Sequence, residues 1–137
     1  MITQKYLDRL TYEIIGCAIE VHKHLGPGLI ESVYEKCFIH ELSLHGLEYK
    51  NQVWVSLEYK NIFLDAELRC DVLVENLISV ELKSVETILN IHEAKLLTYM
   101  KLMQKPKGIL INFNCSNIFK TGQKTFVNEL FAALPKE

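Results

Sequence analysis

The sequence lacks the features of a membrane protein or of a disulfide-stapled secreted domain. No apolar run in its 137 residues approaches the roughly 18 residues that cross a bilayer. The segment Met1–Lys5 has no apolar signal core and is expected to begin a helix. The four cysteines, Cys17, Cys37, Cys70 and Cys115, are far apart, and none forms a C-x-x-C pair. We therefore expect reduced, buried thiols in a cytoplasmic protein with no membrane partner, and neither a disulfide framework nor a zinc site.

Common nucleotide-binding and hydrolase motifs are absent as well, because no P-loop, G-x-G-x-x-G or G-x-S-x-G segment occurs. The net charge is −2, which argues against a protein that holds nucleic acid through bulk charge alone. The charge is unevenly distributed. Residues 1–93 contain 8 Lys and Arg against 15 Asp and Glu, whereas residues 94–128 contain six lysines and no acid. This asymmetry indicates either a phosphate-facing surface or a solvated lysine-bearing edge.

The composition, 49% apolar and 23% charged, is typical of a soluble domain, and residues 1–137 are expected to form one. Apolar residues recur at helical spacing in three segments and at strand spacing in others. The helical segments are 3–25, 29–45 and 88–103; the alternating ones are 52–59, 63–74 and 78–82, followed by a buried strand at 108–111. Residues beyond Cys115 are ambiguous, and 124–133 could form a short helix. The order ααβββαβ predicts an α/β fold with a central mixed sheet flanked by helices.

Three polar side chains on the predicted hairpin are candidates for a site. Side chains alternate along a strand, so Glu81 and Lys83 point the same way. A two-residue loop would place Asp71 and Glu81 on opposite faces, whereas a three-residue loop at 75–77 places them opposite each other. Only the second register collects the apolar residues of the hairpin on one face. These residues are Val72, Val74, Ile78, Val80 and Leu82.

Two directly opposed carboxylates repel each other across a strand pair. A hard divalent cation between Asp71 and Glu81 would remove that repulsion, and carboxylate oxygens suit Mg²⁺ or Mn²⁺. Lys83 would then lie close enough to meet a phosphate oxygen on the same ion. The alternative is a solvated strand face on which Lys83 neutralises Glu81, and the D-x₉-E-x-K spacing alone does not choose between them.

Further segments give the pattern its specificity. Residues 28–34 read G-L-I-E-S-V-Y and fit a GxxExxY signature; R-C-D-V-L-V-E-N at 69–76, V-E-L-K at 80–83 and L-I-N-F at 110–113 accompany it. With a strand Asp and a following E-x-K inside an αβββαβ order, the chain resembles the PD-(D/E)xK nuclease superfamily. Within it, the chain is similar to the GxxExxY family over roughly residues 5 to 128. The resemblance implies a restriction-endonuclease-like core with an extra N-terminal helix.

The resemblance also implies roles for matching residues. Asp71 and Glu81 would bind Mg²⁺ or Mn²⁺, helped by the backbone carbonyl of Leu82, and Glu31 would be a further ligand, directly or through water. The ion would orient and acidify a water and polarise the phosphate. Lys83 would stabilise charge that develops at the scissile phosphate. The expected substrate is nucleic acid, with DNA favoured over RNA, and a homodimer would let so small a domain reach two strands.

The sequence departs from the superfamily pattern at two positions. Cys70 precedes Asp71 where the superfamily name has proline, a position that varies widely. On the 88–103 helix, related nucleases often carry Gln-x-x-x-Tyr, and this chain has Lys95 and Tyr99 at those positions, on one helix face. Lysine binds phosphate as a point charge but cannot accept a hydrogen bond. We expect Lys95, Tyr99 and Lys101 to contact nucleic acid, although Lys95 could equally be a surface lysine.

Two other kinds of function stay open at this point. The chain could be a catalytically inactive module that keeps the nuclease fold and binds nucleic acid or a protein partner. It could also be a structural α/β domain without a site. A site with no affinity for a divalent ion would favour the inactive module, whereas metal binding without cleavage would leave the nuclease and the module both open.

Overall fold

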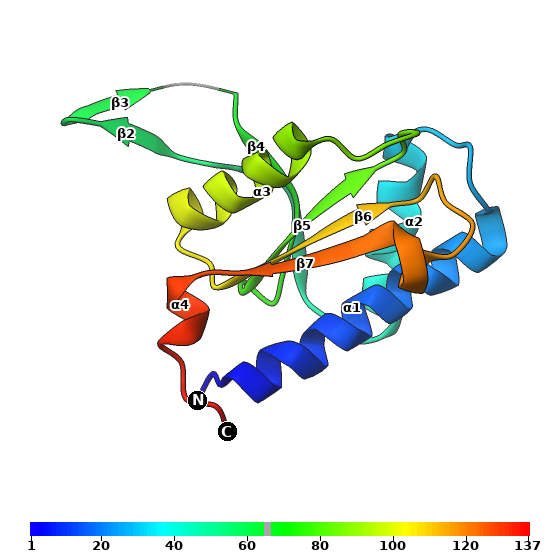
Figure 1. Cartoon of the computed structure of the whole chain (residues 1–137), viewed down its shortest axis with the longest axis horizontal. Coiled ribbons are helices and arrows are strands. Elements are labelled where there is room, and N and C mark those ends of the chain that lie inside the picture. Colours follow the sequence, from blue (N-terminus) through cyan, green and yellow to red (C-terminus); the bar gives the residue numbers. More distant parts are fainter. Residues whose placement is uncertain (65–66) are drawn as a thin grey trace.

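The computed structural model describes residues 1–64 and 67–137, and a five-stranded mixed sheet forms its centre (Figure 1). The strands of this sheet are β1 (Tyr49–Trp54), β4 (Arg69–Val74), β5 (Ile78–Lys83), β6 (Lys107–Asn112) and β7 (Gln123–Val127). They lie in the order β1-β4-β5-β6-β7. Only β5 and β6 run parallel; the other neighbouring pairs are antiparallel. The parallel pair is joined by a helical crossover, as parallel strands require. This is the α/β fold that the sequence predicts, consistent with a restriction-endonuclease-like core.

Helices cover both faces of the sheet (Figure 1). Two of them, α1 (Gln4–Leu25) and α2 (Glu31–Leu44), lie on one face, and the crossover helix α3 (Asn90–Met103) lies on the other. A π-helical turn η1 (Ile118–Gly122) precedes β7, and a short helix α4 (Glu129–Ala132) follows it. The Thr3 side chain caps α1 by accepting a 3.0 Å hydrogen bond from the Tyr6 amide. Within the described residues, no helix combines the length and hydropathy needed to cross a bilayer.

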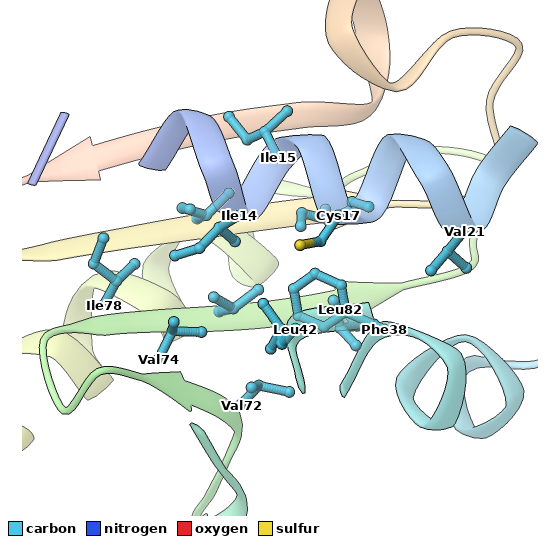
Figure 2. Close-up of a cluster of buried hydrophobic side chains, with 14 of the residues drawn as sticks. Ile14, Ile15, Cys17, Val21, Phe38, Leu42, Val72, Val74, Ile78 and Leu82 are labelled. Carbon is cyan, nitrogen blue, oxygen red and sulfur yellow. The ribbon is translucent and has the colours of Figure 1, made fainter. Parts of the chain in front are cut away.

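The larger core lies between the sheet and the α1–α2 layer, as Figure 2 shows. It contains all five apolar residues that the hairpin was predicted to bury together: Val72, Val74, Ile78, Val80 and Leu82. Helix α1 contributes Ile14 and Cys17, and α2 contributes Phe38 and Leu42 (Figure 2). The period of the sequence thus specifies which face of β4 and β5 turns toward these helices.

The opposite face of the sheet packs against α3. Leu96 and Met100 of α3 are fully buried with Leu110 of β6. Gly108 permits this approach, because a Cβ there would lie 2.6 Å from the Met100 sulfur and 3.0 Å from a Leu96 methyl. The backbone of α3 is therefore held close to β6. This packing fixes the position of the polar side chains of α3 relative to the sheet.

Several predicted elements differ from those observed. The strand expected at 52–59 is interrupted after Trp54, and its second half forms β2 (Leu57–Tyr59). Strand β2 pairs with β3 (Ile62–Leu64) around the predicted Lys60–Asn61 turn, where both residues have positive φ, 46° and 73°. This hairpin projects beyond the central sheet (Figure 1). The strand expected at 63–74 is likewise two strands, β3 and β4, and its residues 65–66 lie outside the described part of the chain.

The tail is mostly strand where a helix was considered. Residues 123–127 form β7, an edge strand against β6, and only Glu129–Ala132 are helical. Apolar side chains at an edge are few and half-exposed, so the sequence carries little periodicity there.

The four cysteines are free thiols: Cys17 and Cys70 are buried, and Cys37 and Cys115 are half-buried. Burial raises the pKa of Cys17 to about 12 and that of Cys70 to about 11, so both stay protonated near neutral pH. These two residues behave as small apolar core residues.

Candidate active site

The β4–β5 hairpin has the three-residue register predicted from its apolar pattern. Val74 pairs with Ile78 and Val72 pairs with Val80, and the Leu77 amide closes the loop on the Val74 carbonyl at 2.9 Å. The regular ladder ends at the Val72–Val80 pair. Asp71 therefore stands at the point where β4 leaves β5.

The Asp71 side chain accepts a hydrogen bond from the backbone of β5 where the ladder has ended. Its Oδ2 atom accepts from the backbone N–H of Leu82 at 2.9 Å. The N–H and C=O of one strand residue point toward the same neighbour, so the Leu82 carbonyl is also directed to the β4 side. The carboxylate thus lies beside the main chain of β5, next to Glu81.

Cys70 does not follow the alternation of the strand predicted at 63–74. Strict alternation would place Cys70 on the same face as Val72, but its thiol lies 3.2 Å from the Ser79 hydroxyl and packs with Leu73 and Tyr99 on the α3 face. The alternation breaks on the Asp71 side of Val72, where the ladder between β4 and β5 ends. On the neighbouring strand β1, Gln52 has a φ of 51°, a second irregularity beside Asp71.

Glu81 is a buried acid without hydrogen bonds. It is only 1% exposed, and neither carboxylate oxygen has a hydrogen-bond partner among the described residues. The pKa of Glu81 is raised to about 8: burial is the largest cause, the negative charge of Asp71 acts in the same direction, and Lys95 opposes both. A solvated strand face, the alternative considered from the sequence, is therefore excluded.

Lys95, rather than Lys83, is the cation beside Glu81. The Lys95 ammonium lies 3.7 Å from Glu81 Oε2 and 5.2 Å from the centroid of the Tyr99 ring. Partial burial, the largest single influence, would lower the pKa of Lys95, but Glu81, Tyr99 and Asp71 together outweigh it and the pKa is raised. Lys95 and Tyr99, four residues apart on α3, both face the site.

An open depression of about 330 Å³ gives access to this group of side chains. Asp71, Lys95 and Tyr99 line it, together with Gln52 of β1, Glu67 and the first residue of β4, Arg69. Solvent thus reaches Asp71 and Lys95, whereas Glu81 lies beneath them.

Lys83 lies two residues beyond Glu81 on β5 and therefore on the same face. The strand stays regular to that point, because Lys83 pairs with Asn112 of β6. Its side chain is half-buried, and within the described ranges its ammonium has no ion-pair partner. The amine is available to an anion.

Neither Glu31 nor Lys101 lines the depression that contains Asp71 and Lys95. Glu31, at the start of α2, lines a different depression with Ser84, and Lys101 is exposed on another side of α3 from Lys95. In the part of the chain that is described, no three Asp, Glu, His or Cys side chains gather as metal ligands. A cation at Asp71 and Glu81 would draw further ligands from backbone carbonyls or water.

The lysines of residues 94–128 do not form one surface. Lys107 is buried and pairs with Asp8 at 2.6 Å, and Lys124 pairs with Glu93 at 3.0 Å. Of the six, Lys95 is the one that lines the depression with Asp71.

Tyr34, the last residue of the G-L-I-E-S-V-Y segment, has a packing role, which the sequence favoured over a catalytic one. Its hydroxyl donates to the Gly26 carbonyl and accepts from the Leu29 amide at 3.2 Å. Its ring stacks on Phe113 with centroids 4.4 Å apart and an interplanar angle of 4°. Tyr34 therefore fixes the loop that carries Glu31 into α2.

Asn112 has a structural role that the sequence did not reveal. It is 8% exposed, accepts from the Val85 amide at 3.1 Å and donates to the Val85 carbonyl at 2.9 Å. It thus ties the end of β6 to the chain just beyond Lys83. Both residues belong to the quoted segments G-L-I-E-S-V-Y and L-I-N-F, so the signal was present in the sequence, although it did not reveal the contacts.

Comparison with known proteins identifies the family. Residues 8–126 match the family model of the PD-(D/E)XK nuclease superfamily, and the chain belongs to that superfamily. Its members are nucleases that generally use divalent metal ions. Neither the curated proteins nor the solved structures gave a match.

The residues present fit a divalent ion. The two buried Glu81 oxygens, which have no hydrogen bonds from the described residues, and the neighbouring Asp71 carboxylate form a hard, negatively charged donor set of the kind that Mg²⁺ and Mn²⁺ prefer. A buried carboxylate without hydrogen bonds is costly. A bound cation would remove that cost.

Proposed function

We propose that the chain is a Mg²⁺- or Mn²⁺-dependent nuclease that hydrolyses phosphodiester bonds of DNA, and that it belongs to the GxxExxY branch of its superfamily. The observation that carries the proposal is Glu81, a fully buried acid that lies beside Asp71 and whose oxygens have no hydrogen bonds from any described residue. A buried carboxylate without hydrogen bonds would only destabilise a purely structural domain. In a metal-binding site the same carboxylate is a ligand.

In this proposal Asp71 and Glu81 hold the ion, and the Leu82 carbonyl is a third ligand. A bound divalent ion supplies a Lewis acid and an activated water. Lys83 stabilises charge on the phosphate oxygens. Glu31, in its separate depression, contributes through a water rather than directly.

The contacts to nucleic acid are proposed for α3. Tyr99 is 7% exposed and lines the depression, whereas Lys101 would reach a phosphate outside it. Lys95 would contact phosphate once a metal ion satisfies Glu81. A second copy of the chain would serve the second DNA strand, and light scattering at several protein concentrations tests for a dimer.

Cleavage assays test the activity. The protein is incubated with single- and double-stranded DNA and RNA in the presence of Mn²⁺, Mg²⁺ or EDTA. We expect cleavage of DNA that requires the metal and falls at least about 100-fold in Glu81→Ala and Lys83→Ala, a loss typical of removing one transition-state contact. Lys5→Ala, which removes an exposed lysine of α1, is the matched control. Cleavage that persists in both site variants contradicts the assignment.

One observation favours a second candidate function. Because Lys95 already pairs with Glu81, the site holds a cation of its own, as an inactive module that binds nucleic acid or a partner protein would. Calorimetry with Mn²⁺ separates the two functions. Binding that is lost in Asp71→Ala supports the nuclease, and the absence of binding in the unaltered protein supports the inactive module.

A further inference from the structure

The relation between Lys95 and Glu81 goes beyond what a nuclease site requires. In the described part of the chain, Lys95 is the one cation within ion-pair distance of Glu81. The 3.7 Å separation of Lys95 Nζ from Glu81 Oε2 is an ion pair but exceeds the usual hydrogen-bond range. Lys95 therefore compensates the charge of the buried acid without saturating its oxygens.

The Lys95 ammonium is held loosely, although the helix that carries it is fixed. The side chain is 38% exposed and has no hydrogen bond within the described ranges, and its Nζ lies over the Tyr99 ring. The neighbouring residue Leu96 and the next-turn Met100 are fully buried. The head group can leave Glu81 for solvent while the Cα atom stays in place, as lysine side chains commonly do at interfaces.

We propose that Lys95 is a tethered counter-ion that occupies the cation position beside Asp71 and Glu81 and is displaced when a divalent ion binds there. The inference rests on the proposed metal site and adds a positioning residue that sets how readily that site fills. A monovalent and a divalent cation repel each other at this separation, so the two cannot share the same carboxylates without cost. The displaced ammonium, still anchored on α3, moves toward the mouth of the depression, where a phosphate would enter.

The competition is tested by Mn²⁺ titration calorimetry on the full chain, at a pH above the pKa of Glu81 so that a proton does not mask the difference. Lys95→Gln and Lys95→Met remove the ammonium, and Lys5→Gln removes a distant lysine as the control. We expect both Lys95 variants to bind Mn²⁺ about tenfold more tightly than the unaltered protein, with Lys5→Gln unchanged. Glu81→Gln should abolish binding in either background.

Thermal unfolding supplies a second measurement that does not depend on activity. Without metal, loss of Lys95 leaves Glu81 uncompensated and lowers Tm, whereas saturating Mn²⁺ raises Tm more in Lys95→Gln than in the unaltered protein. Mn²⁺ binding by Lys95→Gln but not by the unaltered protein also supports the proposal.

Two outcomes overturn the inference. The first leaves the proposed metal site in place, and the second removes it. Equal or weaker Mn²⁺ affinity in both Lys95 variants, with binding intact, removes the counter-ion role and leaves the metal site standing. No Mn²⁺ binding in any variant removes the metal site as well, and the proposed function with it.

Discussion

The Oδ2 atom of Asp71 accepts a hydrogen bond from the Leu82 amide at 2.9 Å, the amide that directly follows Glu81. The carboxylate replaces the main-chain acceptor that a longer β4–β5 ladder would have supplied. Asp71 is thereby fixed by the sheet itself, whereas the buried Glu81 carboxylate has no hydrogen bond within the described residues and only the ion pair with Lys95. The two differ in what each loses on substitution.

Substitution of Asp71 should separate its structural role from its proposed metal-binding role. Asp71→Ala leaves the Leu82 N–H unpaired in a half-buried place, and we expect a loss of about 1–3 kcal/mol in unfolding free energy. Asp71→Asn retains an oxygen acceptor and should lose less than about 1 kcal/mol, yet weaken Mn²⁺ binding as strongly as alanine does. Urea unfolding and calorimetry measure the two effects. Equal stability of the two variants contradicts the hydrogen-bond role.

Glu81 makes stability depend on pH. Because its folded-state pKa is raised to about 8, the folded protein favours the protonated acid more than the unfolded chain does. This contribution is fully present below the ordinary carboxyl pKa and is lost as pH rises through about 8. We expect unfolding free energy to fall by up to about 1.4 kcal/mol per pH unit within that window.

Glu81→Gln removes the titrating group and is the control for this pH dependence. Denaturant unfolding at a series of pH values should give a flatter profile for the variant, which should be more stable than the unaltered protein at the alkaline end. Mn²⁺ should stabilise the unaltered protein selectively. Parallel profiles for the two proteins would refute the burial of a charged group at this position.

Gly108 determines how closely α3 packs on β6, and hence the position of Lys95. Gly108→Ala places a methyl group 2.6 Å from the Met100 sulfur, and such overpacking should cost about 1–3 kcal/mol. Gly16→Ala is the matched control, because nothing lies within 4 Å of its added Cβ in the middle of α1. That variant should gain about 0.5–1 kcal/mol. Thermal or urea unfolding measures both, and a stabilised Gly108→Ala would contradict the close approach of α3 and β6.

Tyr34→Phe isolates the hydroxyl contacts that hold the loop before α2. The variant keeps the stacking on Phe113 and loses the bonds to Gly26 and Leu29, so we expect a loss of about 1 kcal/mol or somewhat more. Hydrogen exchange at the Leu29 amide should accelerate beyond the change in global stability. Tyr12→Phe, at a ring that is 76% exposed, should change neither.

The sequence predicted most of what depends on local period. The helical segments became α1, α2 and α3, and the apolar pattern of the hairpin identified the three-residue loop, because only that register buries Val72 and Val80 together. Opposition of Asp71 and Glu81 followed from the same pattern, although the ladder ends one pair earlier. The residues of other elements that surround Glu81 could not be predicted from the local period of the sequence.

Those residues depend on tertiary contacts. The partner of Glu81 is Lys95 from the crossover helix rather than Lys83 on the same strand, and helix position over a sheet is set by packing at Gly108, not by spacing along the chain. Cys70 changed face because β4 leaves the ladder, which no alternation of side chains records. Strand β7 was obscure because an edge strand buries few apolar groups.

The stacked rings of Tyr34 and Phe113 join two segments that are far apart in the chain, and this ties the two positions together over evolutionary time. Once either ring is lost, the other faces a gap, so the second loss costs less than it would alone. Homologous chains are thus expected to keep both aromatic residues or to replace both.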